Sequence, residues 1–317
     1  MTKKRIDSIK KYTATSLEQL LISVLISSII ILILFEIYSV VKKQSFKIAQ
    51  QIQVLYNQNI ADFYLRTQVN RSGYKGLLST LPLHQYTSIP ISHKAHIIPK
   101  APIAVCKATV ASCKNFVPDK ILDKIINHKI KDSTDVLLIY DIPEKVTYLT
   151  EDMPEYSSPL TIALQQNVFA AGDHMIVADS KFIQRFILSD MIDKKLIHDK
   201  PFNTTNNFVK KFQSGAEVFR VKCVAFYIAK NYRYKNSEVY SLYMDDLSRN
   251  RAEAILDNID NLLVQVLMHD SNIQLVNASN LGWIFNEYIL IKLLFKNKVI
   301  EQNFVTGIEV KNNGQAS

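Results

Sequence analysis

The stretch Leu20–Phe35 reads LLISVLISSIIILILF and has no charged residue in its 16 positions. The wider segment Ser16–Val41 has only two charges, Glu18 and Glu36, in 26 residues. At 1.5 Å per residue, a helix of this length measures about 39 Å, whereas the hydrocarbon core of a bilayer is about 30 Å thick. The sequence therefore predicts a transmembrane helix over residues 15–41, in preference to a helix buried in a soluble core.

The residues that flank this helix predict its orientation. A basic leader, residues 1–14, carries a net charge of +4, and three basic residues follow the helix, Lys42, Lys43 and Lys47. The bias places the N-terminus in the cytoplasm and the C-terminal part outside. A cleavable secretory signal has an apolar region of roughly 7–15 residues and a small-x-small site after it. This run is longer and lacks such a site, so we expect a single-pass anchor that stays attached.

The helical pattern continues beyond the apolar run. Between Lys42 and Asn70 there is neither glycine nor proline, and apolar residues recur at Phe46, Ile48, Ile52, Leu55, Ile60 and Phe63. Their spacing is roughly that of an amphipathic helix, which we predict over residues 42–72. Gly73, the first glycine of the chain, is the predicted end. Ser16–Asn70 would then be one rod of about 80 Å.

The composition excludes several classes of protein. Of the 317 residues, 48% are hydrophobic, which excludes a mainly disordered chain. Seven glycines exclude glycine-rich repeats, and none of the GxGxxG, GxxxxGK[ST], HExxH, GxSxG or CxxC motifs occurs. The net charge of +9 and the 15 tyrosines raise DNA as a partner. Because most of these tyrosines lie in strand patterns, we interpret them as packing residues instead.

Residues 73–317 read as a mixed α+β domain. The segment Phe219–Cys223 alternates with a period of two, and further strands are predicted at Val136–Ile142, Lys145–Thr150, His174–Val177, Phe182–Leu188, Glu238–Tyr243, Ile284–Phe295 and Val305–Val310. Short links such as Asp141–Glu144 favour antiparallel pairing. We expect Arg249–Met268 to begin as a helix and to end extended, and Met191–Ala216 to be a long surface loop.

The chain has three cysteines. Cys106 and Cys113 enclose six residues, and outside the cytoplasm we expect them to form a disulfide, the alternative being two free thiols. Cys223 shares a strand face with Phe219 and Val221, so we interpret it as a small buried hydrophobe.

The remaining polar residues do not indicate a catalytic or metal site. His93 and His96 are the only close pair of histidines, and we interpret them as solvated loop residues. Asp173, His174 and Asp179 cluster in sequence, but the pattern assigns them to a turn and a strand edge. We therefore predict no catalytic site, no metal site and no cofactor.

The start of the apolar helix resembles a known signal. Ala14–Ser23 reads ATSLEQLLIS: after a basic leader and a small residue, a Ser-Leu-x-x-Leu-Leu-Ile run opens the helix. This resembles the class III signal of type IV prepilins. The resemblance implies that prepilin peptidase cuts between Ala14 and Thr15 on the cytoplasmic side, leaving the helix attached and its new N-terminus open to methylation.

Four later segments, in order, resemble the PilW-type minor pilins. They are Arg66–Gly76 (RTQVNRSGYKG), Thr134–Tyr140 (TDVLLIY), Gly172–Asp179 (GDHMIVAD) and Glu253–Gln265, the last similar to a helix of that family. The positions that match the family motifs are Arg71, Gly73, Tyr74, Gly76, Asp135, Gly172 and Asp173. The resemblance implies a type IV pilin-like α+β fold, in which the long N-terminal helix packs on a mainly antiparallel sheet.

The chain departs from the pilin pattern at the signal itself. Thr15 stands where most pilins have Phe, and Gln19 stands at the fifth mature position, where the family has Glu. That Glu is thought to pair with a neighbouring subunit's N-terminus, and Gln19 cannot. Either Glu18 substitutes through a one-residue shift, or the chain is not incorporated into a filament. Two family cysteines are replaced, by Leu77 and Ser180.

The leading hypothesis is a non-enzymatic minor pilin that primes or caps type IV pilus assembly. The resemblance implies as partners the prepilin peptidase, other minor and major pilins through the helix, the assembly platform of the bacterial inner membrane, and lipid. The domain would be periplasmic, or at the pilus tip on the cell surface. Alternatives are a pseudopilin of a type II secretion system, an uncleaved bitopic binding or sensing protein, and an anchored periplasmic enzyme.

Overall fold

The computed structural model describes residues 2–73, 84–89, 101–163, 168–233, 238–249, 251–270, 272–277, 283–284, 288–295 and 303–309. Side chains before residue 17 are outside this description. Tyr74, Gly76, Leu77, His93 and His96 also lie outside it, so the predictions at these positions remain predictions. The chain divides into two compact units, Met1–Asn59 and Ile60–Ser317.

The first element is one unbroken helix, α1 (Thr2–Arg71). Its apolar part is long and apolar enough to cross a membrane, with none of the span buried by the rest of the protein. Three serines within the apolar run donate to helix carbonyls three or four residues earlier, as from Ser23 Oγ to the Leu20 oxygen at 2.8 Å. Their hydroxyl groups are thus satisfied inside the helix, as an apolar surrounding requires.

The second unit is built mainly from strands. In chain order its elements after α1 are β1 (His84–Thr87), β2 (Ile103–Lys107), α2 (Val110–Cys113), α3 (Asp119–Ile126), β3 (Asp135–Tyr148), β4 (Leu160–Thr161), β5 (His174–Ala178), β6 (Phe182–Ile187), β7 (Asp190–Ile192), β8 (Lys195–Ile197), β9 (Glu217–Lys230), β10 (Tyr240–Asp246), β11 (Arg251–Asp257), β12 (Ile259–Asp270), β13 (Asn272–Asn277), β14 (Trp283–Ile284), β15 (Tyr288–Phe295) and β16 (Asn303–Glu309). This is an α+β arrangement.

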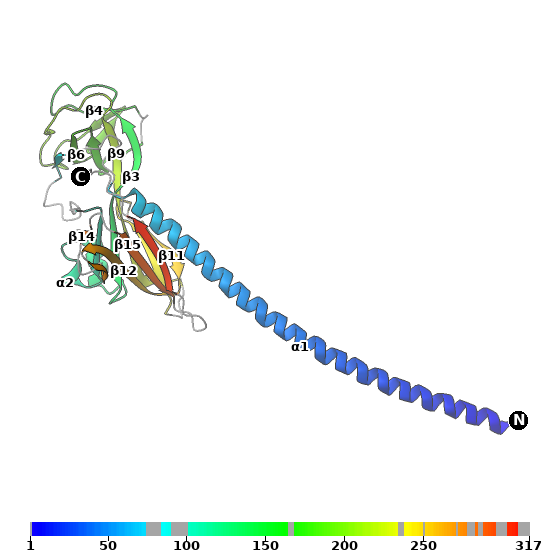
Figure 1. Ribbon diagram of the computed structural model, residues 1–317. Coiled ribbons are helices and arrows are strands. Elements are labelled where there is room, and N and C mark those ends of the chain that lie inside the picture. Colours follow the sequence, from blue (N-terminus) through cyan, green and yellow to red (C-terminus); the bar gives the residue numbers. More distant parts are fainter. Residues whose placement is uncertain are drawn as a thin grey trace. The chain divides into compact units, whose positions relative to one another are not determined.

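Two long strands organise the main sheet. Within the described residues this sheet has nine strands in the order β1-β6-β5-β9-β3-β2-β14, with β10 on the second half of β9 and β11 on β10. Figure 1 shows β3 and β9 running side by side through the domain, and their ladder is antiparallel. The other described ladders are also antiparallel, except that β1 runs parallel to β6. The mainly antiparallel sheet predicted from the sequence is therefore confirmed.

The core lies between this sheet and a second one. The second sheet has the order β13-β12-β15-β16, and the side chains of β12 and β15 pack against β2, β3 and β9. The last turns of α1 join the same cluster through Ala61, Leu65 and Val69, each at most 1% exposed. The end of the long helix is thus part of the hydrophobic core of the domain.

Two further clusters flank this core. On the opposite face of β2, β3 and β9, the short helices α2 and α3 and the link between them contribute the buried residues Cys113, Val117, Ile121 and Ile125. A separate cluster unites β5 and β6 with the segment before β9, where Phe208 and Phe212 are buried.

Three sequence predictions are wrong. Arg249–Met268 does not begin as a helix, nor is Glu253–Gln265 helical; the region forms β11 and β12, because pairing with β10 and β15 outweighs its local helical pattern. Asp141–Glu144 does not link two strands, since β3 runs through it, with Asp141 at φ 52° and two shifts of register absorbing the irregularity. Met191–Ala216 is not simply a surface loop, because it contains β8 and buried phenylalanines.

Candidate functional site

Among the residues that the structure describes, most of the exposed large apolar side chains lie on the outside of α1. Between Leu17 and Val41 its large apolar side chains are exposed all round the helix, from 46% at Val40 to 71% at Phe35. Contiguous apolar surface of this extent is not stable in water and marks contact with lipid or with other helices. Glu18 and Gln19 are exposed at its start, and the backbones of Ala14 and Thr15 lie one turn earlier in the same helix.

The C-terminal end of α1 is fixed to the middle of β3. Gly73 has φ 66°, a conformation that favours glycine, and its N–H donates to the carbonyl of Tyr140 at 3.2 Å. A Cβ on Gly73 would lie 2.8 Å from Cβ of Pro102. The guanidinium of Arg71 donates to the carbonyl of Pro143. Arg71 and Gly73 therefore have a shared role, which is to tie the helix to the irregular part of β3.

Asp135, at the start of β3, joins the two sheets. Its side chain is fully buried, and Oδ2 accepts a hydrogen bond from the backbone N–H of Val264 in β12 at 2.7 Å. Oδ1 faces Nζ of Lys107 at 2.6 Å, which compensates the buried charge. An aspartate is needed here because one carboxylate serves a cation in the first sheet and an amide in the second.

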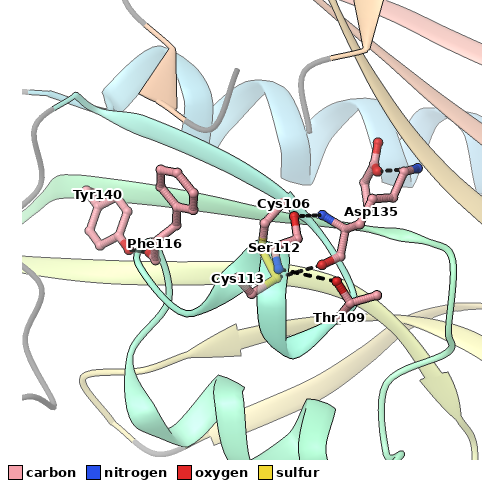
Figure 2. Close-up of a disulfide and its surroundings, with 8 residues drawn as sticks. Cys106, Thr109, Ser112, Cys113, Phe116, Asp135 and Tyr140 are labelled. Atoms are coloured by element: carbon pink, nitrogen blue, oxygen red, sulfur yellow. Dashed lines mark hydrogen bonds and ion pairs between the residues drawn. A yellow bond between two sulfur atoms is a disulfide. The ribbon is translucent and has the colours of Figure 1, made fainter. Parts of the chain in front are cut away.

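Cys106 and Cys113 form a disulfide, with their Cα atoms 5.2 Å apart. Figure 2 shows that it closes the turn between β2 and α2, where Thr109 Oγ1 caps α2 by accepting from the N–H of Ser112 at 3.3 Å. Nearby, the hydroxyl of Tyr140 donates to the carbonyl of Phe116. These contacts fasten the α2–α3 layer to the sheet.

The third cysteine lies against the same layer. Cys223 is half-buried and packs against the cluster that α2 and α3 form with the sheet. Burial raises the pKa of its thiol, and the nearby carboxylates of Asp141, Asp246 and Asp245 raise it further. The thiol therefore stays protonated at neutral pH, which makes it a poor nucleophile.

Gly172 and Asp173 lie at the turn before β5. Gly172 has φ 90°, and Oδ2 of Asp173 accepts from the N–H of Ala170 at 2.9 Å and from Arg220 at 3.2 Å. Arg220 also binds Glu144, which pairs in addition with Lys222 and Arg249. Burial alone would raise the pKa of Glu144, but these three cations hold it below its ordinary value. The cluster is a network of ion pairs that ties β3 to β9.

The carboxylate of Asp179 also has hydrogen-bond and ion-pair partners within the domain. Its Oδ1 accepts from the N–H groups of Lys181 and Phe182, both at 2.8 Å, and its Oδ2 pairs with Lys210. Burial would raise the pKa of this carboxyl, but Lys210 and the two amides lower it. His174 begins β5, at the other end of the strand. The length of β5 therefore separates His174 from Asp179. Within the described residues, no group of three or more metal-ligating side chains occurs.

Ion pairs at two buried carboxylates, Asp141 and Asp245, were not foreseen from the sequence. Arg185 in β6 pairs with Asp141 through both terminal nitrogens, at 2.5 and 2.6 Å, with each side chain about a tenth exposed. Lys120 and Lys124 of α3 both reach the fully buried carboxylate of Asp245. The only signal was an arginine inside the otherwise buried run of β6, because pairing at such a distance along the chain leaves no local pattern.

Comparison with known proteins adds no relative: no family model, no curated protein and no solved structure matches this chain.

Proposed function

We propose that the protein is a minor pilin-like subunit, held in the bacterial inner membrane by α1 and acting in the assembly of a type IV pilus. The observation that carries the proposal is that one helix serves two environments. Its N-terminal part exposes a continuous apolar surface, while Ala61, Leu65 and Val69 near its end are built into the core of an antiparallel domain. A cleavable signal would have no reason to be part of that core.

The ordered motifs supply the more specific part of the proposal. The start of the helix resembles a prepilin signal, and Arg71, Gly73 and Asp135 each have a contact that orders the helix end or the sheets. In the proposed sequence of events, prepilin peptidase cuts after Ala14 and the helix then leaves the lipid to bundle with other pilin helices. The disulfide-bonded domain, too large for a repeated shaft subunit, would prime or cap the growing tip.

Glu18 is the proposed assembly residue. It is exposed on α1, at the edge of the apolar run, while its neighbour Gln19 is neutral. A carboxylate in this position costs a few kcal/mol in lipid unless it is paired. Pairing with the amino terminus of a neighbouring subunit would favour removal from the membrane into a bundle.

A second candidate is an uncleaved bitopic protein with a binding domain outside the membrane. Thr15 and Gln19, which depart from the pilin signal, favour it. Both candidates use the same anchor, and they differ in whether the chain leaves the membrane.

The test follows the protein in its native cells. Sheared surface filaments are probed with an antibody against residues 101–317, and filament number is compared with and without the gene. We expect few copies, at filament ends, and a loss of filaments on deletion that the wild-type gene restores. Unchanged filament number with all antigen in the inner membrane would contradict the proposal and favour the bitopic protein.

A further inference from the structure

Two carboxylates lie on one face of the membrane helix, one near each end of the span. Glu18 and Glu36 are 18 residues apart, which is five turns of α1 and about 27 Å, so they share a face. This distance is close to the thickness of the hydrocarbon core, about 30 Å. Both side chains are exposed, and neither carboxylate has an ion pair or hydrogen bond to the described residues. Ionisable groups at such depths are costly unless they meet a partner.

The residues between them form a regular seam. Steps of four and three residues from Glu18 lead through Ile22, Leu25, Ile29 and Leu32 to Glu36, and further steps reach Ser39 and Lys43. The four apolar side chains are 48–69% exposed. This heptad spacing is the one that allows parallel helices to pack against each other with knobs-into-holes contacts.

The charges on the seam select one register. In two parallel copies without stagger, Glu36 would face Glu36, and Glu18 would face Glu18, which is repulsive where water is scarce. A stagger of seven residues keeps the seam intact and brings Glu36 of one copy level with Lys43 of the other. The same stagger brings Lys11 of the first copy level with Glu18 of the second, because this pair is also seven residues apart.

We propose that this face of α1 binds a second copy of the same chain, in parallel and offset by one heptad, with Glu36 and Lys43 forming the outer ion pair. The inference needs only the membrane span and does not rest on the proposed function. The outer pair survives removal of residues 1–14, so it serves the cleaved and the uncleaved chain alike.

The offset is tested by cross-linking the full chain in phosphatidylcholine vesicles, which provide no anionic lipid to compete for Lys43. In a Cys223→Ser background, copies with Leu32→Cys and copies with Ser39→Cys carry different tags. We expect oxidation to join residue 32 to residue 39 about five- to tenfold more than residue 32 to itself. A product dominated by 32-to-32 links would overturn the proposal. So would a cross-linking yield no higher than that of a monomeric membrane protein in the same vesicles.

Charge reversal then tests the ion pair in the same assay. Glu36→Lys and Lys43→Glu should each lower the 32-to-39 product, and combining both in one chain should restore it. Lys42→Glu is the matched control, because it changes the same charge about 120° around the helix from Glu36. If the single reversals left the yield of the 32-to-39 product unchanged, the pair would not form. The same conclusion would follow if the double variant gave no more of this product than either single variant.

Discussion

The backbone N–H of Gly73 donates to the carbonyl of Tyr140 at 3.2 Å, which joins the first turn after α1 to the middle of β3. Tyr140 in turn reaches the α2–α3 layer through its hydroxyl group, and its neighbour Asp141 pairs with Arg185. The helix end, the α2–α3 layer and β6 therefore meet at one irregular stretch of β3. Substitutions in this stretch should therefore lower the stability of the whole domain.

Gly73→Ala should destabilise the domain more than Gly172→Ala. Both glycines have positive φ, so each substitution should cost about 1–2 kcal/mol of unfolding free energy through backbone strain. Only at Gly73 would the new Cβ also strike a neighbour, Pro102 at 2.8 Å; at Gly172 it meets nothing described within 4 Å. Denaturant unfolding followed by circular dichroism should show a further loss of about 1–3 kcal/mol for Gly73→Ala. Equal losses would show that the contact with Pro102 does not matter.

Leu65→Ala and Phe63→Ala separate the two faces of the helix end. Leu65 is fully buried in the core, whereas Phe63 is 66% exposed. We expect Leu65→Ala to lose about 2–5 kcal/mol of unfolding free energy, through lost burial and the cavity left behind. Phe63→Ala should change it by no more than about 0.5 kcal/mol. Similar melting temperatures for the two variants would refute the docking of α1 described above.

The disulfide should stabilise the domain mainly through its unfolded chain. The two cysteines are seven positions apart in the sequence. In the chain-entropy model, closing a loop of this size raises the free energy of unfolding by about 2–3 kcal/mol, which replacing both Cys106 and Cys113 by Ala would remove. Calorimetry of the detergent-solubilised protein should show a lower melting temperature for the double variant. Adding reductant to the wild type should give the same shift, and none in the variant.

Stability should fall in acid partly because of Glu144. Its pKa is lower in the folded protein than in the unfolded chain, so it stabilises the fold at pH values above its unfolded pKa, about 4.3. This contribution disappears as the pH falls through the lower, folded pKa. Glu144→Gln should therefore lower the melting temperature at pH 7 and converge with the wild type towards about pH 2. The exposed Glu151→Gln is the control, and a constant offset of Glu144→Gln across this range would contradict the assignment.

Local patterns in the sequence were enough for the elements whose environment is uniform. The run from Leu20 to Phe35 predicts its helix because it is uncharged and long enough for a membrane-spanning helix. The alternation around Phe219–Cys223 predicts its strand. Gly73 marks the helix end because few other residues adopt its φ.

Features that depend on distant residues could not be found in this way. The segment Arg249–Met268 is predicted to begin as a helix, but pairing with β10 makes its first part, β11, extended. Asp141–Glu144 has the composition of a turn, but Arg185 and Arg220 hold its carboxylates within one strand. The amphipathic pattern chose Phe63 for the apolar face, whereas the sheet buries Ala61, Leu65 and Val69. In each case the partner that decides the structure lies outside the segment itself.

The most direct test of the proposed function is the intact mass and N-terminal peptide of the protein extracted from its native inner membrane. We predict a chain that starts at Thr15, with or without a methyl group, because cleavage after Ala14 is the step that would commit α1 to assembly. A chain that still starts at Met1, in cells whose other pilins are cut, would contradict the account and leave an anchored binding protein.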